Sequence, residues 1–452
     1  MPLKPGKVKR KHKRWLVFLA ILLLLLIAGY FNRIRLERVV IAISISRMHT
    51  FMPPAQLATE SAWSRFWDEA GFYWDVSELR VARARRLAEF NPKLKPLVKE
   101  IVKRQAAGDG MSYSMHIYRE IRWRLNFTPD TAETSKRIAD LRRSLSQPQE
   151  QKLADSQQPG DGSWARGINV WYLKLYYSVD HLKDSAHMAY RPAFLDRVNT
   201  PDKLKAKLDS DLYDNFTKTG VFNREELDET FSAMARLLFA SKPIGFAFHP
   251  QLKHALQDYV NRWQNPATDC WGQWMVDSKG RIWKMDDMAM TFHVISDLHG
   301  QVDHKHKIAK RVLQLDDVEF PTGIRFNGHY ENHLNWDVVK IFKYAWPALD
   351  TATRRQAGAE ISKMLKWCFT ESLQPDGSFK ISDLDDTMGD AYYYGVSFLS
   401  DAGYFSAKDR FWTKQDFPGG AALQAKIEAK IKAVGWNDSG MKDAYDVLEG
   451  VR

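Results

Sequence analysis

The chain has 452 residues, 44% of them hydrophobic, so it is long enough to bury one large core or two smaller ones. Its formal net charge of +11 is concentrated at the start, where residues 1–14 carry seven Lys or Arg and no acid. The rest has 59 basic and 55 acidic residues, a balance that argues against a nucleic-acid-binding groove.

The basic start is followed by 17 residues without a charge, "WLVFLAILLLLLIAGYF" at 15–31. This run is long enough to span a bilayer and exceeds the apolar part of a usual signal peptide, so we expect an uncleaved single-pass anchor. The positive residues before it predict a cytoplasmic N-terminus and a periplasmic or otherwise extracytoplasmic main domain at the inner (plasma) membrane. The expected organisation is a basic tail at 1–14, an anchor at 15–31, juxtamembrane helices at 32–105, a repeat domain at 106–405 and a closing helix and tail at 406–452.

Cysteine content and common motifs exclude several chemistries. Only Cys270 and Cys368 are present, which argues against structural zinc. Outside the cytoplasm the two could pair, but the sequence does not fix their separation, so a disulfide and two free thiols both stay open. Phosphate-loop, dinucleotide-binding and serine-elbow motifs are missing from the sequence, and we predict no cofactor.

The middle of the chain repeats one phrase. "SQQPGDGSW" at 156–164 and "SLQPDGSF" at 372–379 differ by one inserted residue. Related glycine–aromatic turns occur at 220–222, 280–283 and 328–330, with a weaker one at 110–113. The glycines of these turns are separated by 48 to 60 residues, a period typical of stacked supersecondary units.

Each turn precedes a helical pattern, and further amphipathic stretches lie between them, whereas strand-like runs are scarce. The helical patterns that follow the turns include "INVWYLKLYY", "LDETFSAMARLLFA", "DDMAMTFHVISDL" and "LNWDVVKIFKYAW". Six such helix pairs would close into an all-α, (α/α)6 toroid, with inner helices around a central cavity and outer helices around them.

Two repeats share a second phrase, "GVFNREELDETF" and "GSFKISDLDDTM", which align without a gap. With its Gln…Asp-Gly-Ser-Trp turns, the sequence resembles the squalene–hopene cyclase and prenyltransferase-type toroids over about residues 100–405. The "DLDDT" segment is similar to the Asp-x-Asp-Asp-Thr motif of class II terpene cyclases. The resemblance implies Asp385 as a proton donor, with Asp383 and Asp386 as its neighbours.

The acids at 383–390 also permit other interpretations. On a helix, Asp383, Asp386 and Asp390 would share one stripe, where like charges cost about 0.2–0.5 kcal/mol per pair. They could cap a helix, hold a divalent cation or carry acid–base chemistry. First-turn acids such as Asp287 and Asp337 have the same capping alternative. Because the inner helices of a toroid start at one rim, we expect these acids to gather there.

Other polar and aromatic side chains fall at corresponding positions. The densest patch, "FNGHYENHLNWD", supplies Tyr330 and His333 as a possible acid and base. The segments "SWARGIN" and "RIWKMDD" add further polar and aromatic residues to the rim. The predicted substrate-binding residues are Trp164, Arg166, Asn169, Trp283, His329, Asn332, Asn335, Phe379 and Tyr393. Aromatic faces at these positions suit sugar rings, and would equally stabilise carbocations.

Three functions follow from these observations. The first is a hydrolase or lyase acting on an envelope or extracellular polysaccharide. In a hydrolase, Asp385 or Asp386 is the general acid and Asp287 or Asp337 is the base or nucleophile. In a lyase, His333 is the base and Tyr330 is the acid. The second is an isoprenoid cyclase-like enzyme that protonates an alkene with Asp385. The third is a non-catalytic polysaccharide-binding or assembly module, with the acids as helix caps.

Overall fold

The computed structural model describes the chain between residues 76 and 450, with interruptions. The predicted anchor at 15–31 lies outside the described residues. Among those described, no helix combines the length and the apolar character needed to cross a membrane. The residues outside the description are 1–75, 107–113, 116, 119–120, 122–124, 126–130, 147–156, 166–170, 184–187, 215–223, 241–243, 266–267, 277–281, 285, 319, 327, 383–384, 386, 436–438 and 451–452.

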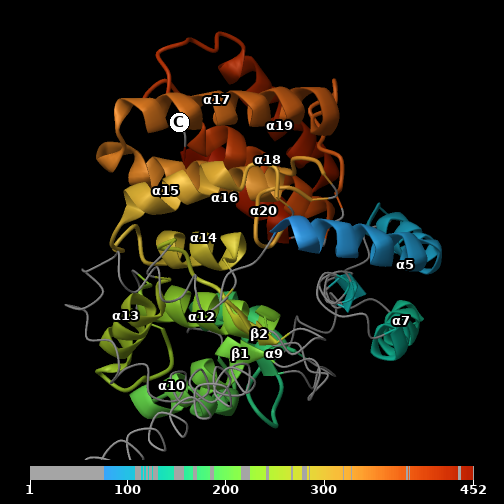
Figure 1. Ribbon diagram of the computed structural model, residues 1–452, viewed down its shortest axis with the longest axis vertical. Coiled ribbons are helices and arrows are strands. Elements are labelled where there is room, and N and C mark those ends of the chain that lie inside the picture. Colours follow the sequence, from blue (N-terminus) through green and yellow to red (C-terminus); the bar gives the residue numbers. More distant parts are fainter. Residues whose placement is uncertain are drawn as a thin grey trace, which may run out of the picture.

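The described fold is mainly α-helical, which confirms the predicted all-α class, and from residue 171 onward two series of helices alternate. In the first series, the A helices, each member packs against the next along the chain. These are α9 (Trp171–Lys183), α12 (Arg224–Leu238), α14 (Met288–Asp297), α16 (Asn332–Ala345), α18 (Met388–Asp401) and α20 (Ser439–Gly450). In Figure 1, α9 and α12 lie in the lower half of the view, α16, α18 and α20 lie above them, and α14 lies between.

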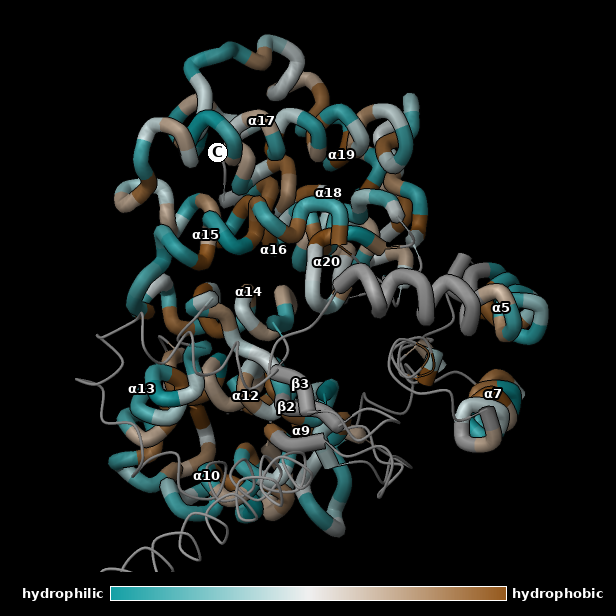
Figure 2. The backbone as a smooth tube through the Cα atoms, in the orientation of Figure 1, coloured by the Kyte–Doolittle hydropathy of each residue, from teal (hydrophilic) through white to brown (hydrophobic). Residues whose placement is uncertain are grey.

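The second series, the B helices, packs on the A helices. They are α10 (Pro201–Leu212), α13 (Leu252–Trp263), α15 (Lys305–Gln314), α17 (Thr351–Trp367) and α19 (Gly420–Val434). Each has one apolar face; in α15, for example, Ile308, Ala309 and Val312 are buried while Lys310 is exposed. Figure 2 shows this alternation of hydrophobic and hydrophilic residues along α15 and α17. Shorter turns are η2 (Ala193–Arg197), η3 (Trp346–Ala348) and η4 (Cys368–Ser372).

One small sheet of three short strands accompanies the helices. β1 (Tyr213–Asp214) pairs in parallel with β2 (Trp274–Val276), which pairs antiparallel with β3 (Ile282–Lys284). The segment 280–283, which the sequence suggested as a repeat turn, therefore supplies most of strand β3.

The phrase "QPGDGSW" forms a hydrogen-bonded turn ahead of α9. The Gly162 amide donates to the Gln158 carbonyl at 2.8 Å, and the Gln158 amide donates to the Ser163 carbonyl at 2.7 Å. Asp161 Oδ1 accepts from the amide and the hydroxyl of Ser163 at 3.0 and 2.7 Å. Gly162 has a φ of +74°, and a Cβ there would lie 2.2 Å from the Arg191 carbonyl oxygen, so the position requires glycine.

The second copy, "QPDGSF", forms the same turn ahead of α18. The Gly377 amide donates to the Gln374 carbonyl, and the Gln374 amide donates to the Ser378 carbonyl. Asp376 Oδ1 again accepts from the amide and hydroxyl of the serine, at 3.0 and 2.6 Å, and Gly377 has a φ of +86°. The repeated residues therefore form a repeated local structure.

A third copy, "NPATDCW" at 265–271, was not recognised in the sequence. The Asp269 amide donates to the Asn265 carbonyl, and the Asn265 amide donates to the Cys270 carbonyl, as in the other two turns. Asp269 occupies the glycine position with a φ of +59°. The Trp271 amide donates to Thr291 Oγ1 on α14, just as the Trp164 amide donates to a serine hydroxyl on α9. Because aspartate stands at the glycine position, the sequence pattern did not reveal this copy of the turn.

Two separate cores organise the described chain. The main core runs from Trp164 to Leu448 through the A and B helices. A second core joins α5 (Val76–Ala106) and α7 (Thr131–Leu145), the α5–α7 unit, which projects to one side of the molecule (Figure 1). The described core residues between Met115 and Leu141, assigned by sequence to the repeat domain, thus share their core with the preceding helix. Both cysteines are buried free thiols.

Candidate functional site

A buried ionic cluster lies at the starts of α12 and α14. Arg224, the first residue of α12, donates from Nε and Nη2 to the two carboxylate oxygens of Asp287 at 2.7 and 2.9 Å. It also donates from Nη1 to Glu225 Oε1 at 2.7 Å. Asp287 is the N-cap of α14 and accepts from the Met290 amide at 3.0 Å. One predicted rim acid is therefore both a helix cap and the partner of a buried arginine.

The cluster continues one turn further along α12. Asp228 Oδ1 lies 2.8 Å from His293 Nδ1 on α14, and its other oxygen lies 3.3 Å from Arg224 Nη2. Burial alone would raise the pKa of Asp228, but the charges of His293 and Arg224 lower it. Burial alone would lower the pKa of His293, but Asp228 raises it to about 10. At neutral pH the two therefore form an ion pair.

Glu229, the next residue, has a raised pKa, whereas the pKa of Asp228 is lowered. Burial and the negative charge of Asp228 raise the pKa of Glu229 to about 8. Its side chain is only partly buried, and it shares one stripe of α12 with Ser232 and Arg236, three and seven residues on. The cluster therefore presents a neutral carboxyl directly beside an ionised one.

Asp337, on α16, is the most isolated acid of the cluster. It is 2% exposed, and within the described part of the chain neither of its carboxylate oxygens has a hydrogen-bond partner. Burial raises its pKa well above the ordinary value, and the negative charges of Asp228 and Asp287 add to this rise. Burial therefore favours the neutral form of this carboxyl. Asn335, on the same helix, is also buried, and its side-chain amide atoms have no hydrogen-bond partner among the described residues.

A second group of charges comes from α9, α12, α14 and α20. Arg236 Nη2 donates to Asp180 Oδ1 on α9 at 2.6 Å, and Ser232 Oγ donates to Asp297 on α14 at 2.9 Å. Burial and the charge of Asp180 raise the pKa of Asp443 on α20. Charged groups of α9, α12 and α20 are thus close enough to influence one another.

Aromatic side chains accompany these charges on α16 and α18. His333 stacks on Tyr394 with ring centres 3.9 Å apart and planes 4° apart. Trp336 lies against Phe292 and Tyr393, and its Nε1 donates to Asp401 at 2.8 Å. Lys340 and Lys343 bind the same carboxylate at 3.1 and 2.8 Å. Since these side chains are partly exposed, α16 and α18 present a mixed aromatic and charged surface.

Of the acids at 383–390, Asp385 and Asp390 are described, and they have different local roles. Helix α18 begins at Met388, and Thr387 and Asp390 form a reciprocal capping box at its start. Asp390 therefore has a capping role. Asp385 is buried ahead of the helix, where Oδ2 accepts from the Ser382 amide at 2.7 Å. Asp383 and Asp386 lie outside the described residues.

The two aligned phrases also differ in structure. In "ELDETF", Asp228 and Thr230 lie inside α12, which begins at Arg224. In "DLDDTM", Asp385 precedes the helix and Thr387 caps it. The residues that match in the sequence therefore occupy different positions relative to their helices.

The histidine- and tyrosine-rich patch divides between two sides of α16. Tyr330 donates its hydroxyl to Glu360 on α17 at 2.6 Å, and the guanidinium carbon of Arg325 lies 3.3 Å from its ring centre. Asn332 Nδ2 donates to Ser372 Oγ at 2.8 Å. His329 is exposed and pairs its backbone with Phe326. His333, in contrast, stacks on α18.

The remaining predicted binding residues are mostly core residues. Trp164 is buried and stacks on His181, with ring centres 5.0 Å apart. Phe379 is buried against Tyr392 and the backbone of Gly395. Tyr393 is partly exposed beside Trp336. Arg166 and Asn169 lie outside the described residues, and Trp283 is placed only by its backbone in β3.

Sequence reasoning did not single out Arg224 or Glu229. The available signal was the run "REELDE", in which Arg224 and Asp228, and also Glu225 and Glu229, stand four apart on one helix. Within the described part of the chain, no group of three His, Cys, Asp or Glu side chains is placed to hold a metal ion. The proposed cation group at Asp383, Asp386 and Asp390 falls partly outside that description.

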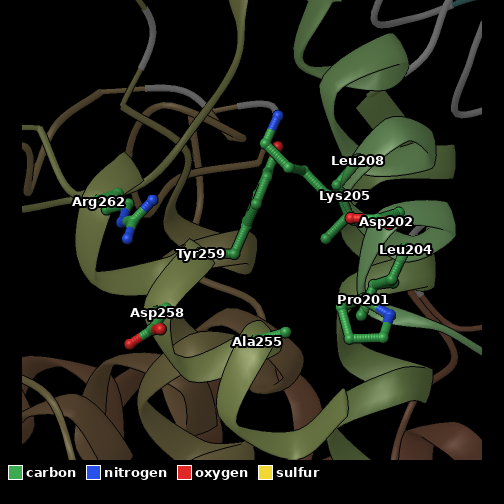
Figure 3. Close-up of a pocket in the computed structure, with 9 residues that line it drawn as sticks. All are labelled: Pro201, Asp202, Leu204, Lys205, Leu208, Ala255, Asp258, Tyr259 and Arg262. Atoms are coloured by element: carbon green, nitrogen blue, oxygen red, sulfur yellow. The ribbon is translucent and has the colours of Figure 1, made fainter. Parts of the chain in front are cut away.

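A separate small cleft of about 150 Å³ lies between the B helices α10 and α13. Figure 3 shows its lining side chains coming from both helices, including Lys205 from α10 and Tyr259 and Arg262 from α13. None of the residues of the ionic cluster lines it. Comparison of the chain with protein-family models, curated proteins and solved structures finds no match.

Proposed function

We propose that the chain is a membrane-anchored, extracytoplasmic enzyme that cleaves an envelope or extracellular glycan by acid–base catalysis, as a hydrolase or a lyase. The observation that carries this proposal is Glu229, a partly exposed carboxyl held neutral beside the ionised Asp228. A general acid must keep its proton at the working pH and must be able to reach the leaving group. Glu229 meets both requirements, whereas Asp337 is too deeply buried to contact a polymer.

The proposal includes the closure of the A helices into an (α/α)6 toroid, with Glu229 on its inner wall. The first and last members of the series are α9 and α20. Arg236 binds Asp180 of α9, and both Asp180 and Arg236 influence the pKa of Asp443 of α20. Electrostatic contact between the two ends of the series supports a closed ring.

In this assignment the parts of the cluster have distinct roles. Glu229 donates a proton to the glycosidic oxygen, and Asp228, paired with His293, keeps that proton in place by its negative charge. The second carboxylate of a hydrolase would come from the same surface, where Asp180 and Asp297 lie; the base of a lyase would be His333. The lyase acid predicted at Tyr330 is replaced, because its hydroxyl is committed to Glu360.

The terpene cyclase-like alternative has weaker support. Its proposed acid, Asp385, is buried in a local turn and accepts from the Ser382 amide, so it is less accessible to a substrate than the partly exposed Glu229.

The test incubates the purified full-length protein with a panel of neutral and acidic polysaccharides. New reducing ends report hydrolysis, and ultraviolet-absorbing unsaturated ends report lyase chemistry. Product formation that is lost in Glu229→Gln but kept in Glu226→Gln would support the proposal. Glu226 is a suitable control because it lies on the same helix but bonds to Lys207 of α10. Binding without cleavage of any polymer would instead support the non-catalytic module.

A further inference from the structure

We propose that the α5–α7 unit docks on the anionic surface of a lipid bilayer. This inference concerns a part of the molecule remote from Glu229 and does not depend on the glycan reaction. It rests on the charge of the unit, on its separate core and on its position in the chain.

The exposed surface of the unit is strongly basic. Among its described side chains, seven exposed residues are Lys or Arg, whereas the acids are Glu89, Glu100 and Asp140. Glu100 lies 4.0 Å from Lys103 and Asp140 lies 3.2 Å from Arg143, so the cations still outnumber the acids. The basic residues are Lys93, Lys95, Lys99 and Lys103 on α5 and Lys136, Arg142 and Arg143 on α7. Since the sequence after residue 14 is close to electrically balanced, this is a local concentration of positive charge.

Helical spacing keeps these cations away from the core of the unit. On α5, Lys95, Lys99 and Lys103 stand four apart, while Phe90, Leu94 and Ile101 are buried. On α7, Lys136 and Arg143 stand seven apart and share a face, while Ile138 and Leu141 are buried. The apolar faces meet each other, so the basic faces point to the surroundings.

The unit is also held in one piece, which gives the charges fixed positions. Arg104 Nη1 donates to the Leu145 carbonyl at 2.8 Å, which ties the last turn of α5 to the end of α7. Ser114 and Ser144 hydroxyls lie 2.5 Å apart in the same core. A preorganised basic surface loses little conformational entropy when it meets a charged plane.

A bilayer is the partner that best fits the chain order. The predicted anchor ends at residue 31 and α5 begins at Val76, so the unit is the first described structure after the anchor. Anionic lipid headgroups attract each basic residue that comes within a Debye length, and an anchor keeps the unit near that surface. Together, one hydrophobic span and a polybasic surface would fix the orientation of the main body relative to the membrane.

The test measures the distance between the unit and the lipid in the full-length protein. Ala139→Cys, exposed on α7 between Lys136 and Arg143, receives a donor fluorophore, while native Cys270 and Cys368 are buried. The protein is placed in nanodiscs whose lipids carry an acceptor. We expect greater energy transfer in nanodiscs with 30% anionic lipid, about the level used in model membranes, than in purely zwitterionic ones, and loss of the difference at about 0.5 M salt.

Variants that lack basic side chains of α7 provide the decisive test. Lys136→Ser/Arg142→Ser/Arg143→Ser should lower the ratio of docked to undocked protein by roughly 100-fold, because each cation contributes about a factor of five. The control, Arg355→Ser/Lys366→Ser/Lys414→Ser, removes three exposed cations from the α17–α19 region and should change nothing. Equal transfer in both lipids, or equal loss in both triple variants, would overturn the proposal. So would displacement of the unit from anionic nanodiscs by a soluble acidic polysaccharide at physiological salt, which would assign the surface to a glycan.

Discussion

His293 Nδ1 lies 2.8 Å from Asp228 Oδ1, which joins the middle of α14 to the second turn of α12 through a buried ion pair. Arg224 contacts the same aspartate from the other side at 3.3 Å. Because Asp228 is held ionised by two cations, its charge acts on the neighbouring Glu229. Together with burial, which has the largest effect, the charge of Asp228 raises the pKa of the proposed acid, while the charge of His293 opposes this rise.

The first prediction concerns the pKa of His293. Replacing Asp228 by Asn should lower this pKa by roughly 1–3 units, because the ion pair is lost while burial remains. An NMR titration of the His293 ring measures the change, and Asp180→Asn, an exposed acid on α9, is the control. An unchanged His293 titration in Asp228→Asn would contradict the assignment.

The same pair predicts how stability depends on pH. The pKa of His293 is about 10 in the folded chain against an ordinary 6.5, so its raised value favours folding most when the histidine is protonated. The contribution is complete below about pH 6.5 and is lost as pH rises through about 10. Denaturant unfolding between pH 6 and 10 should show this loss in the native protein and much less of it in Asp228→Asn.

The third prediction concerns catalysis by Glu229. Cleavage should fall as pH rises through about 8, where the folded-state pKa of Glu229 places the loss of its proton. Glu229→Gln should lower the rate by roughly 10²–10⁴-fold, the usual contribution of a general acid. The pH–rate profile of kcat/KM measures the first effect. A rate that stays constant from pH 6 to 10 would remove Glu229 from the role of acid.

Arg224 provides a prediction about stability. Arg224→Met should destabilise the protein by about 3–5 kcal/mol, because it leaves the buried carboxylates of Asp287 and Glu225 without their partner. Adding Asp287→Asn should recover part of the loss, since the two residues act as a pair. Urea unfolding at neutral pH measures both values. Arg262→Met, on the surface of α13, should stay within about 0.5 kcal/mol of the native protein.

The repeat turn gives a matched pair of glycine substitutions. Gly162→Ala should cost at least about 1–3 kcal/mol, because Gly162 has a φ of +74° and the new Cβ would meet the Arg191 carbonyl. Gly160→Ala, two residues earlier, meets nothing within 4 Å and should have little effect. Equal stability of the two variants in urea unfolding would contradict the turn described here.

Local features of the fold were accessible from the sequence. The phrase repeated at 156–164 and 372–379 predicted two related turns, because a left-handed glycine and an Asp-x-Ser hydrogen bond depend only on neighbouring residues. Apolar spacing likewise predicted helices at the positions of α9, α12, α14 and α16. The capping box of Thr387 and Asp390 was also predictable from the sequence. The number of acids at 383–390 favoured a catalytic interpretation instead.

The candidate site depended on tertiary structure. Arg224, Asp287 and Asp337 come from three helices separated by more than a hundred residues in total, and no local pattern states which of their faces meet. Their protonation depends on burial and on neighbouring charges, which exist only after the A helices pack. The sequence by itself determined the helices, the repeat and the stock of acids. Among the described acids, packing decided which became caps and which became ion pairs, and it gave Glu229 a raised pKa together with partial exposure.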